Sequence, residues 1–278
     1  MQRERFIKYI DENRGHWTAD TITRYISVLL TVPDEIEDWD LGQFHTWISN
    51  HHWGNNMQYT VSVIIRGYCR WRFGTGHPGS QVKVRRKRTG PQRALTLDKL
   101  NKLICSFDTM TPKGIRDLAI AALLVDTGLR SAEICRLDIG HLDLDRCKLA
   151  VITKGGNWGE AVFSEWTAQY LNSWLSIRKT SCKNVFVSLG GKTRGQPITR
   201  TGLDMIMRDW AKAIGIGHLS PHDFRRTFAT ISTRMGAPAR VLQVAGRWSD
   251  ISMVERYTST IEKEDFMPYF PMKAVMTH

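Results

Sequence analysis

One short stretch of the sequence places a histidine and an arginine where a phosphate site would need them. Ser220 is a suitable N-cap, Pro221 suits the first helical position, and Asp223 can complete a capping box, so a helix is predicted to begin here. Helical periodicity puts His222 and Arg225 side by side and away from the core, in a first turn whose free N–H groups favour an anion. A surface histidine and arginine without function would give the same pattern.

A second arginine is paired with a carboxylate at the start of another predicted helix. Arg130 and Glu133 are three residues apart, which is close enough for their side chains to interact. A carboxylate can orient an arginine to hold a phosphate through two parallel hydrogen bonds. We therefore take Glu133 as a supporting residue for Arg130, although such pairs are also common surface salt bridges.

Three further side chains are candidates for proton transfer, phosphate contact and nucleophilic attack. Lys154 lies beside two glycines at the tip of a predicted β-hairpin, where its ammonium group could reach into a groove. Tyr257 follows Trp248 by nine positions and lies in a predicted helix, and its phenol is a candidate nucleophile. A solvated lysine and a tyrosine that only packs are the alternatives.

The order of these residues resembles that of the tyrosine recombinase or phage integrase family. The catalytic domain of that family carries Arg, Lys, His-x-x-Arg, His or Trp, and Tyr in this order. The chain fills the six positions with Arg130, Lys154, His222, Arg225, Trp248 and Tyr257. The resemblance covers nearly the whole chain, because its first part looks like the small helical core-binding domain of the family, followed by a basic linker.

Two motifs depart from the family pattern. Many members have His-x-Leu-Arg-His, whereas the fifth position here is Arg226. The common Leu-Gly-His has become Ala-Gly-Arg-Trp, so the glycine lies one step further from the aromatic residue. Tryptophan has precedent at position 248 but cannot transfer a proton. We expect Trp248 to pack against Tyr257 and to donate its indole N–H to phosphate.

The resemblance implies that the chain is a site-specific DNA recombinase or integrase that cleaves and rejoins duplex DNA. Tyr257 would attack the scissile phosphodiester in line, form a 3′-phosphotyrosine and release a 5′-hydroxyl that later attacks a partner strand. Because the bond energy is kept, no ATP is required. Paired arginines would supply the positive charge that a metal ion supplies elsewhere, so no metal and no cofactor are expected.

The resemblance also implies a role for each remaining residue. Arg130 and Arg225 would act as fixed cations on the phosphate. Lys154 would be the acid that protonates the leaving 5′ oxygen. His222 would assist deprotonation of Tyr257, because an unperturbed phenol with a pKa of about 10 is protonated at neutral pH.

The composition agrees with a nucleic-acid partner. Lys plus Arg number 39 against 27 Asp plus Glu, which gives a formal charge of +12. A merely basic soluble protein would show the same balance. Five dispersed cysteines without a C-x-x-C pair argue against a disulfide framework and a zinc site. No apolar run is long enough to span a bilayer, and no targeting segment is evident, so a cytoplasmic protein without a membrane partner is expected.

The elements that must position these residues are mainly α-helices with a small β-hairpin or sheet, an α+β organisation. Residues 1–80 are expected to form a helical, SAM-like DNA-binding domain, and residues 94–278 the catalytic domain with a C-terminal tail. Residues 81–93 are expected to be a basic interdomain linker that does not pack, since they contain almost nothing apolar. The hairpin turn is predicted at residues 154–159 and a further short strand at residues 185–188.

The resemblance implies a C-shaped clamp around double-stranded DNA, held mostly through phosphates and therefore sensitive to salt. The basic residues expected to contact DNA are Lys83, Arg85, Arg86, Lys87, Arg88, Arg93, Arg66 and Arg70. Recombination joins two core sites and needs four protomers, so a homo-tetramer is expected on paired sites, while a monomer could exist in free solution. The tail after Tyr257 could dock into a neighbouring subunit or pack in cis.

Two other functions fit the same residues. A type IB topoisomerase uses similar chemistry to relax supercoiled DNA and needs no partner site. A DNA-binding regulator on a disabled recombinase scaffold would need no chemistry, but the complete set of six positions counts against it.

Overall fold

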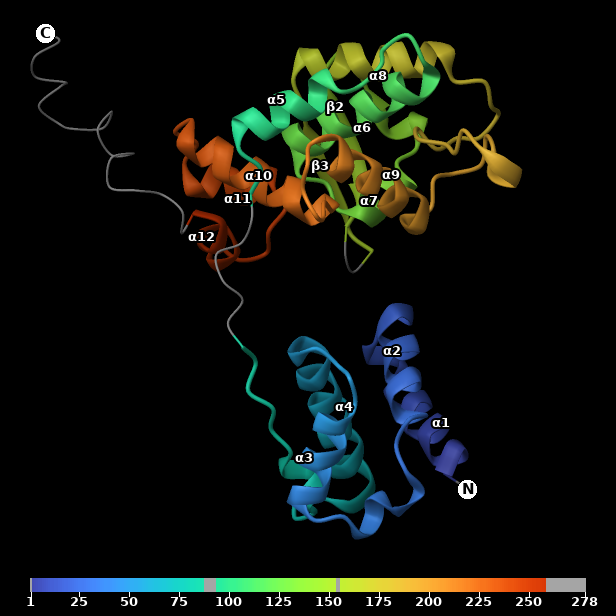
Figure 1. Ribbon diagram of the computed structural model, residues 1–278, viewed down its shortest axis with the longest axis vertical. Coiled ribbons are helices and arrows are strands. Elements are labelled where there is room, and N and C mark those ends of the chain that lie inside the picture. The colour runs from blue at the N-terminus through green and yellow to red at the C-terminus, as the bar shows by residue number, and fades with distance from the viewer. Residues whose placement is uncertain (1, 88–93, 154–155, 259–278) are drawn as a thin grey trace, which may run out of the picture. The chain divides into compact units, whose positions relative to one another are not determined.

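The chain is mainly α-helical with one small antiparallel sheet, as the sequence predicts (Figure 1). The computed structural model describes residues 2–87, 94–153 and 156–258, and for residues 2, 3 and 256–258 it describes the backbone alone. The chain divides into two compact units, Met1–Gly90 and Pro91–His278, each with its own hydrophobic core. We describe each unit by itself.

Helices are the regular elements of the first unit among its described residues. Its α-helices are α1 (Gln2–Asn13), α2 (Ala19–Leu29), α3 (Leu41–Asn50) and α4 (Asn55–Phe73). Short 3-10 helices cover Arg14–His16, Asp34–Asp38 and Pro78–Gln81. Helix α4 contacts both α2 and α3, and α1 packs on α2. The core of this unit therefore lies between α4 and the helices around it.

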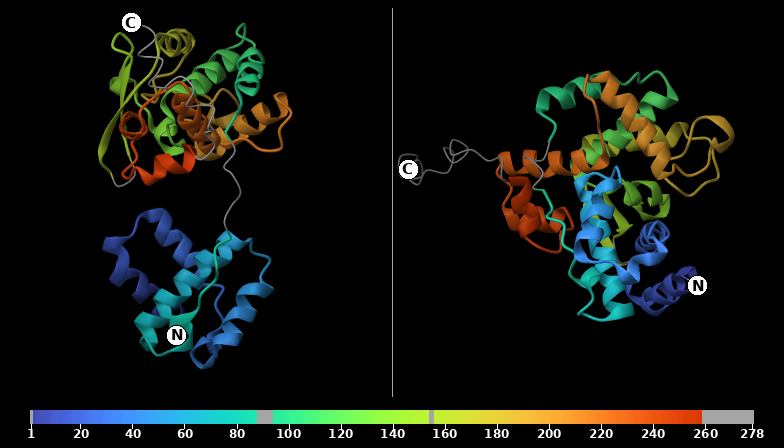
Figure 2. Two further views of the ribbon diagram at one scale, coloured as in Figure 1. Left: turned by 90° about the vertical axis from the view of Figure 1, so that its left-hand side faces the viewer. Right: turned by 60° about the horizontal axis from the view of Figure 1, so that its bottom comes forward.

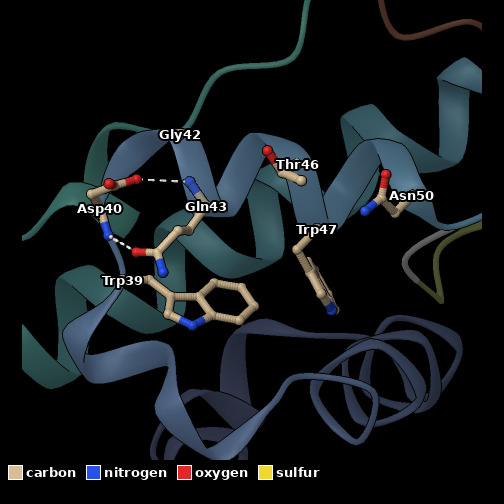
Figure 3. A pocket seen from close by; sticks show the side chains of 7 residues that line it. All are labelled: Trp39, Asp40, Gly42, Gln43, Thr46, Trp47 and Asn50. Carbon is tan, nitrogen blue, oxygen red and sulfur yellow. Dashed lines mark hydrogen bonds between the residues drawn. The ribbon is translucent and has the colours of Figure 1, made fainter.

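Local capping explains where helices of the first unit begin. The hydroxyl of Thr18 accepts the Thr21 N–H at 3.3 Å and so caps the start of α2. At α3, the Asp40 carboxylate accepts the Gln43 N–H at 2.7 Å, and the Gln43 side chain accepts the Asp40 N–H at 2.8 Å. Figure 3 shows these two bonds at one end of a pocket on α3, with Trp39 lining the same pocket. This pocket contains none of the residues predicted to do chemistry.

The helices of the second unit pack around one buried central helix. Its helices are α5 (Leu97–Cys105), α6 (Pro112–Thr127), α7 (Ser131–Arg136), α8 (Glu165–Ile177), α9 (Arg200–Ala213), α10 (Pro221–Arg234), α11 (Ala239–Ala245) and α12 (Ser252–Thr258), with 3-10 helices at Ile139–His141 and Gly191–Thr193. Helix α6 is buried along most of its length and packs against α8 and α10. Inside this core, Asp117 accepts hydrogen bonds from Arg116 at 2.7 Å and from the Trp210 indole at 3.1 Å.

The sheet of the second unit carries the predicted hairpin. Its strands β1 (Leu142–Asp143), β2 (Lys148–Ile152) and β3 (Trp158–Val162) pair antiparallel in the order β1-β2-β3. Ile152 faces Trp158 at the end of the β2–β3 ladder, so residues 153–157 form the connecting loop. Figure 2 shows the hairpin at the edge of the second unit. The predicted hairpin is confirmed, but its turn does not reach residue 159, because Trp158 and Gly159 pair with β2 as part of β3.

The predicted strand at residues 185–188 is not a strand in the structure. Val187 forms an isolated bridge with Pro197, and the Val185 N–H donates to the carbonyl of Leu137 at 2.8 Å. Proline has no N–H group to donate, so a regular ladder cannot continue through Pro197. The apolar run instead serves the core, where Val185 accepts the Trp174 indole N–H at 2.8 Å.

The basic segment at the end of the first unit is partly packed, contrary to expectation. Val84 packs against the core of the first unit, and Val82 before it is fully buried. The side chain of Asn55 donates to the Arg85 carbonyl at 3.2 Å and accepts the Lys87 N–H at 2.7 Å. An extended backbone turns alternate residues to opposite sides, so the valines face the core while the charged side chains between them stay exposed.

Candidate active site

One pocket of the second unit gathers four of the predicted residues. Arg130, His222, Arg225 and Trp248 line a pocket of about 430 Å³, together with Met253 of α12. The four residues lie at the starts of α7 and α10 and in the segment between α11 and α12. Residues that are far apart in the sequence therefore meet at one place.

The start of α10 forms as the sequence predicts. The Asp223 carboxylate accepts the Ser220 N–H at 2.9 Å and the Ser220 hydroxyl at 2.6 Å, which completes the capping box. Pro221 is the first residue of the helix. His222 follows directly and is exposed at the pocket. The start of the helix thus presents the imidazole to the pocket.

The surroundings of His222 favour its neutral form. Partial burial lowers the pKa of the imidazole below its ordinary value of 6.5. The guanidinium of Arg226 lowers this pKa further, and Arg225 and Arg130 act in the same direction, whereas Asp223 opposes them. The ring is therefore neutral at neutral pH and can accept a proton.

Arg225 is buried, which corrects the expectation that it points away from the core. Only 3% of its surface is exposed. Its guanidinium donates to the carbonyl of Gly128 at 2.7 Å and to the carbonyl of Gly246, and its central carbon lies 4.3 Å from the Trp248 ring centroid. Helical periodicity does put Arg225 opposite the main core, but a second apolar cluster that includes Phe228 and Trp248 covers that side of α10. The guanidinium is therefore fixed in place.

Glu133 orients Arg130, as the spacing predicts. Its carboxylate accepts the Arg130 guanidinium at 2.7 Å and the Arg130 backbone N–H at 2.9 Å. The Glu133 side chain is 2% exposed, whereas that of Arg130 is 36% exposed. One part of the Arg130 guanidinium is thus held by a buried carboxylate, and the rest of it remains accessible from the pocket.

Arg247 is a further charged residue near the site. It is not among the residues predicted from the sequence. Its guanidinium lies 3.6 Å from the second oxygen of Glu133 and donates to the carbonyls of Thr127 at 3.1 Å and Ala245 at 2.9 Å. Burial lowers the pKa of Arg247, and the charge of Glu133 opposes this effect. The signal for it in the sequence was the departure from Leu-Gly-His, which inserts an arginine next to the aromatic residue.

Trp248 is held by its neighbours in a buried position. It is 6% exposed and stacks on Phe228 with ring centroids 6.1 Å apart. A side chain at Gly246 would collide with it, because a Cβ there would lie 1.9 Å from the Trp248 ring. The expected contact of Trp248 with Tyr257 falls outside the described side chains. The described contacts place the indole ring against the guanidinium of Arg225.

The two remaining predicted residues are described in part or not at all. Tyr257 lies in α12, which confirms the predicted helix, but its side chain is outside the described residues. Helix α12 packs on α10 and α11, with Val254 fully buried. Lys154 itself lies outside the described residues. Its loop is closed by a hydrogen bond from the Thr153 N–H to the Asn157 carbonyl at 2.8 Å.

The residues expected to contact DNA differ in how freely they are presented. Lys83, Arg85, Arg86, Lys87 and Arg70 are exposed on the first unit. Arg88 and Arg93 lie outside the described residues.

Two of these arginines make contacts within the first unit. Arg86 donates to the side chain of Asn56 at 3.3 Å and lies 5.9 Å from the Tyr59 ring centroid. Arg66 is half-buried and donates to the Val82 carbonyl at 3.3 Å. Part of the basic surface is therefore tied to α4.

Within the described residues, no three His, Cys, Asp or Glu side chains come together as metal ligands would. None of the helices in the same part of the chain combines the length and the apolar character needed to cross a membrane.

Comparison with known proteins identifies the family. The sequence model of the phage integrase family matches residues 93–264, a segment that contains all six predicted catalytic positions. The chain belongs to the phage integrase family. A tyrosine recombinase XerD of Neisseria meningitidis serogroup B is 33% identical over 170 residues, and this match spans 59% of the chain and only 57% of the relative. A tyrosine recombinase XerD of Listeria monocytogenes serotype 4b is 33% identical over 265 residues, which cover 91% of the chain and 83% of the relative.

A solved structure of a transposon integrase has the same fold. The Tn1549 transposon integrase in complex with transposon right-end DNA superimposes with a TM-score of 0.74 and covers 99% of both chains, at 16% sequence identity. The predicted resemblance is thus confirmed for the family and for the fold.

Proposed function

We propose that this chain is a tyrosine-type site-specific recombinase that cleaves and rejoins duplex DNA through a 3′-phosphotyrosine. The observation that carries the proposal is the pocket in which two fixed arginines, a neutral histidine and a tryptophan converge. The two relatives described above are tyrosine recombinases, and the Tn1549 integrase structure contains DNA. Both facts favour the same substrate for this chain.

The pocket is suited to a phosphodiester because its cations are preorganised. Arg130 is oriented by Glu133, and Arg225 by two backbone carbonyls, so neither guanidinium has to be ordered when DNA binds. The positive end of the α10 dipole adds to the charge of these two arginines. Fixed donors of this kind stabilise the negative charge that grows on the phosphate oxygens during attack.

In the proposed reaction the Tyr257 oxygen forms a bond to phosphorus while the bond to the 5′ oxygen breaks. His222, neutral at neutral pH, accepts the phenol proton, and Lys154 gives a proton to the leaving 5′ oxygen. The reverse step, with a 5′-hydroxyl from a partner strand as nucleophile, restores the phosphodiester and releases Tyr257. Bonds of equal number and type are broken and formed, so the cycle requires neither ATP nor a metal ion.

The first unit is proposed to bind DNA around the core site. Exposed cations on its basic segment, Lys83, Arg85 and Lys87, would contact backbone phosphates. Residues 1–80 would serve as the core-binding domain, residues 81–93 as the connection, and residues 94–278 as the catalytic domain of a DNA clamp. The chain would act in the cytoplasm as a homo-tetramer on paired sites and be a monomer when free.

A covalent trapping experiment tests the nucleophile. A core site would first be selected from random duplex DNA by binding to Tyr257→Phe. A nicked version of that site should then give a protein–DNA adduct with the wild-type chain in the presence of EDTA, and none with Tyr257→Phe. Tyr269→Phe is the matched control and should form the adduct normally. An adduct that survives Tyr257→Phe would show that another residue is the nucleophile.

The same substrate separates the alternative functions. A type IB topoisomerase would relax supercoiled plasmid that lacks the selected site and would not recombine two sites. A regulator on this scaffold would bind the site without forming any adduct. Recombination of a plasmid carrying two sites, with little relaxation of a plasmid carrying none, is the outcome expected here.

A further inference from the structure

We infer that Arg247 is a positioning residue for the proposed DNA cleavage, acting through the carboxylate of Glu133 on Arg130. The inference rests on the proposed function, but the contacts that support it are independent of any substrate. Arg247 is not among the residues that line the pocket, and its side chain is 7% exposed. It therefore cannot touch the DNA phosphate in this arrangement and must act through its neighbours.

The backbone at Arg247 is in a conformation that most residues avoid. Its φ is +55°, and among the described residues only Cys147 shares a positive φ without being a glycine. Such a conformation is unfavourable for a residue with a Cβ, and it persists only where the surroundings determine it. Contacts of the Arg247 side chain with three other segments hold the backbone in this conformation.

The first contacts tie together the ends of two helices. The guanidinium donates to the carbonyl of Thr127, the last residue of α6, and to the carbonyl of Ala245, the last residue of α11. Carbonyls at helix C-termini have no partner within the helix, so a buried cation satisfies them and the helix dipole together. Arg247 thus fixes α11, and the Trp248 that follows it, against the turn leading to Arg130.

The second contact is electrostatic and reaches the candidate active site. Glu133 Oε2 faces Arg247 at 3.6 Å and also accepts the Arg130 N–H, while Oε1 holds the Arg130 guanidinium. One buried carboxylate therefore lies between two guanidinium groups, which leaves a net positive charge beside the pocket. Its attraction to Arg247 prevents the Glu133 carboxylate from turning away from Arg130.

The third contact reaches the hairpin. A Cβ at Gly159 would lie 3.1 Å from Cδ of Arg247 and 2.8 Å from the Thr153 methyl group. The aliphatic part of the Arg247 side chain thus packs against β3 at Gly159, close to the start of this strand. One side chain therefore contacts β3 of the hairpin, the Arg130–Glu133 pair and the end of α11 next to Trp248.

The test removes the side chain without straining the backbone. Arg247→Gly is the first variant, since glycine accepts a positive φ. We expect adduct formation with the nicked site to slow by about 100-fold, because a displacement of about 1 Å of an orienting group has this effect on a rate. DNA affinity should stay within about threefold, since the residue is outside the pocket. Arg247→Lys should recover part of the rate, and Arg146→Ala, at a side chain that is 80% exposed, is the control.

A double-mutant cycle asks whether Arg247 acts through Glu133. If it does, Glu133→Gln and Arg247→Gly combined should slow adduct formation little more than the more severe single variant. Thermal unfolding would be followed for each variant, and rates would be compared well below every midpoint. The inference would be overturned if the double variant slowed adduct formation by the product of the two single factors. An Arg247→Gly rate within about threefold of the wild-type rate would overturn it as well.

Amide hydrogen exchange provides a readout that does not depend on activity. Arg247→Gly should speed exchange in the peptide of residues 127–136 and leave residues 97–105 unchanged. If wild type forms no adduct and this local change appears, the proposed function fails while the positioning contact stands. If exchange at residues 127–136 is unchanged, Arg247 does not position Glu133.

Discussion

At the scale of single residues, the burial of Arg225 distinguishes this site from a basic surface. A guanidinium bonded to two carbonyls and packed on an indole ring is fixed in one orientation. Lysine has the same charge but lacks the planar fork that satisfies two acceptors at once. A substitution at position 225 that keeps the positive charge should therefore still slow DNA cleavage.

The corresponding prediction is that Arg225→Lys slows adduct formation by about 10²–10³-fold, the usual effect of losing one preorganised donor. The neighbouring Arg226→Lys is the matched control, since Arg226 pairs with Asp223 at 3.1 Å and keeps its charge in the variant. Rates would be measured on the nicked core site at saturating DNA. Equal rates for the two variants would contradict a fixed role for the Arg225 guanidinium.

The pH dependence of cleavage follows from His222. If its neutral form accepts the phenol proton, activity falls as the pH drops through its pKa. Since burial and neighbouring arginines lower that pKa, the acidic limb of kcat/KM should lie below 6.5. The limb should disappear in His222→Gln, whose residual rate should be independent of pH in this range. A limb above 6.5 would assign the titration to another group.

The sequence predicted the position of a single residue correctly where neighbouring residues in the chain determine it. The capping box of Ser220 and Asp223 depends on four consecutive residues, and so it could be read directly. The burial of Arg225 could not be read, because its partners lie near residues 128 and 246. Arg247 was missed for the same reason, since a positive φ and contacts across the unit leave no periodic signal.

At the scale of elements, the end of α11 is built around a close approach between Gly246 and Trp248. Gly246→Ala would put a methyl group 1.9 Å from the indole ring and displace it. We expect a loss of about 1–3 kcal/mol in the free energy of unfolding, the usual cost of overpacking. Denaturant unfolding measures it. Gly217→Ala, where no atom lies within 4 Å of the added Cβ, is the control. Similar stability of both variants would mean that the ring moves freely.

Helix α4 arranges the basic segment through Asn55, which holds the backbone at Arg85 and Lys87. Asn55→Ala should weaken binding of the core site, because the cations then lose their fixed spacing. Fluorescence anisotropy measures the affinity, with Asn50→Ala on α3 as the control. Adding Asn55→Ala to a variant that already lacks the Lys83, Arg85 and Lys87 charges should have little further effect. A full additional loss would show that Asn55 contacts DNA by another route.

The errors at this scale have simple causes. Residues 185–188 have the composition of a strand, but their partner segment contains Pro197, which ends the ladder. The segment after residue 81 has too little apolar content to form a core, yet two alternating valines suffice to attach it to a core that already exists. Composition and periodicity describe a segment itself. They give no information on the surface against which the segment packs.

At the scale of the whole molecule, the net charge of +12 implies binding that depends on salt. Each phosphate contact contributes about 0.9 to the slope of log affinity against log salt. Replacing Lys83, Arg85 and Lys87 by alanine should therefore reduce the slope by up to about 2.7. The affinity of each variant would be titrated between low and physiological salt. An unchanged slope would place the phosphate contacts elsewhere on the chain.

The pocket that gathers Arg130, His222, Arg225 and Trp248 lies entirely in the second unit. The proposed chemistry therefore needs no side chain of the first unit. Replacing the first unit by that of another family member should leave the phosphate pocket intact, and the DNA site that the chimera prefers would show which unit selects it. The division near residue 90 therefore marks a junction at which the first unit can be exchanged without changing the pocket.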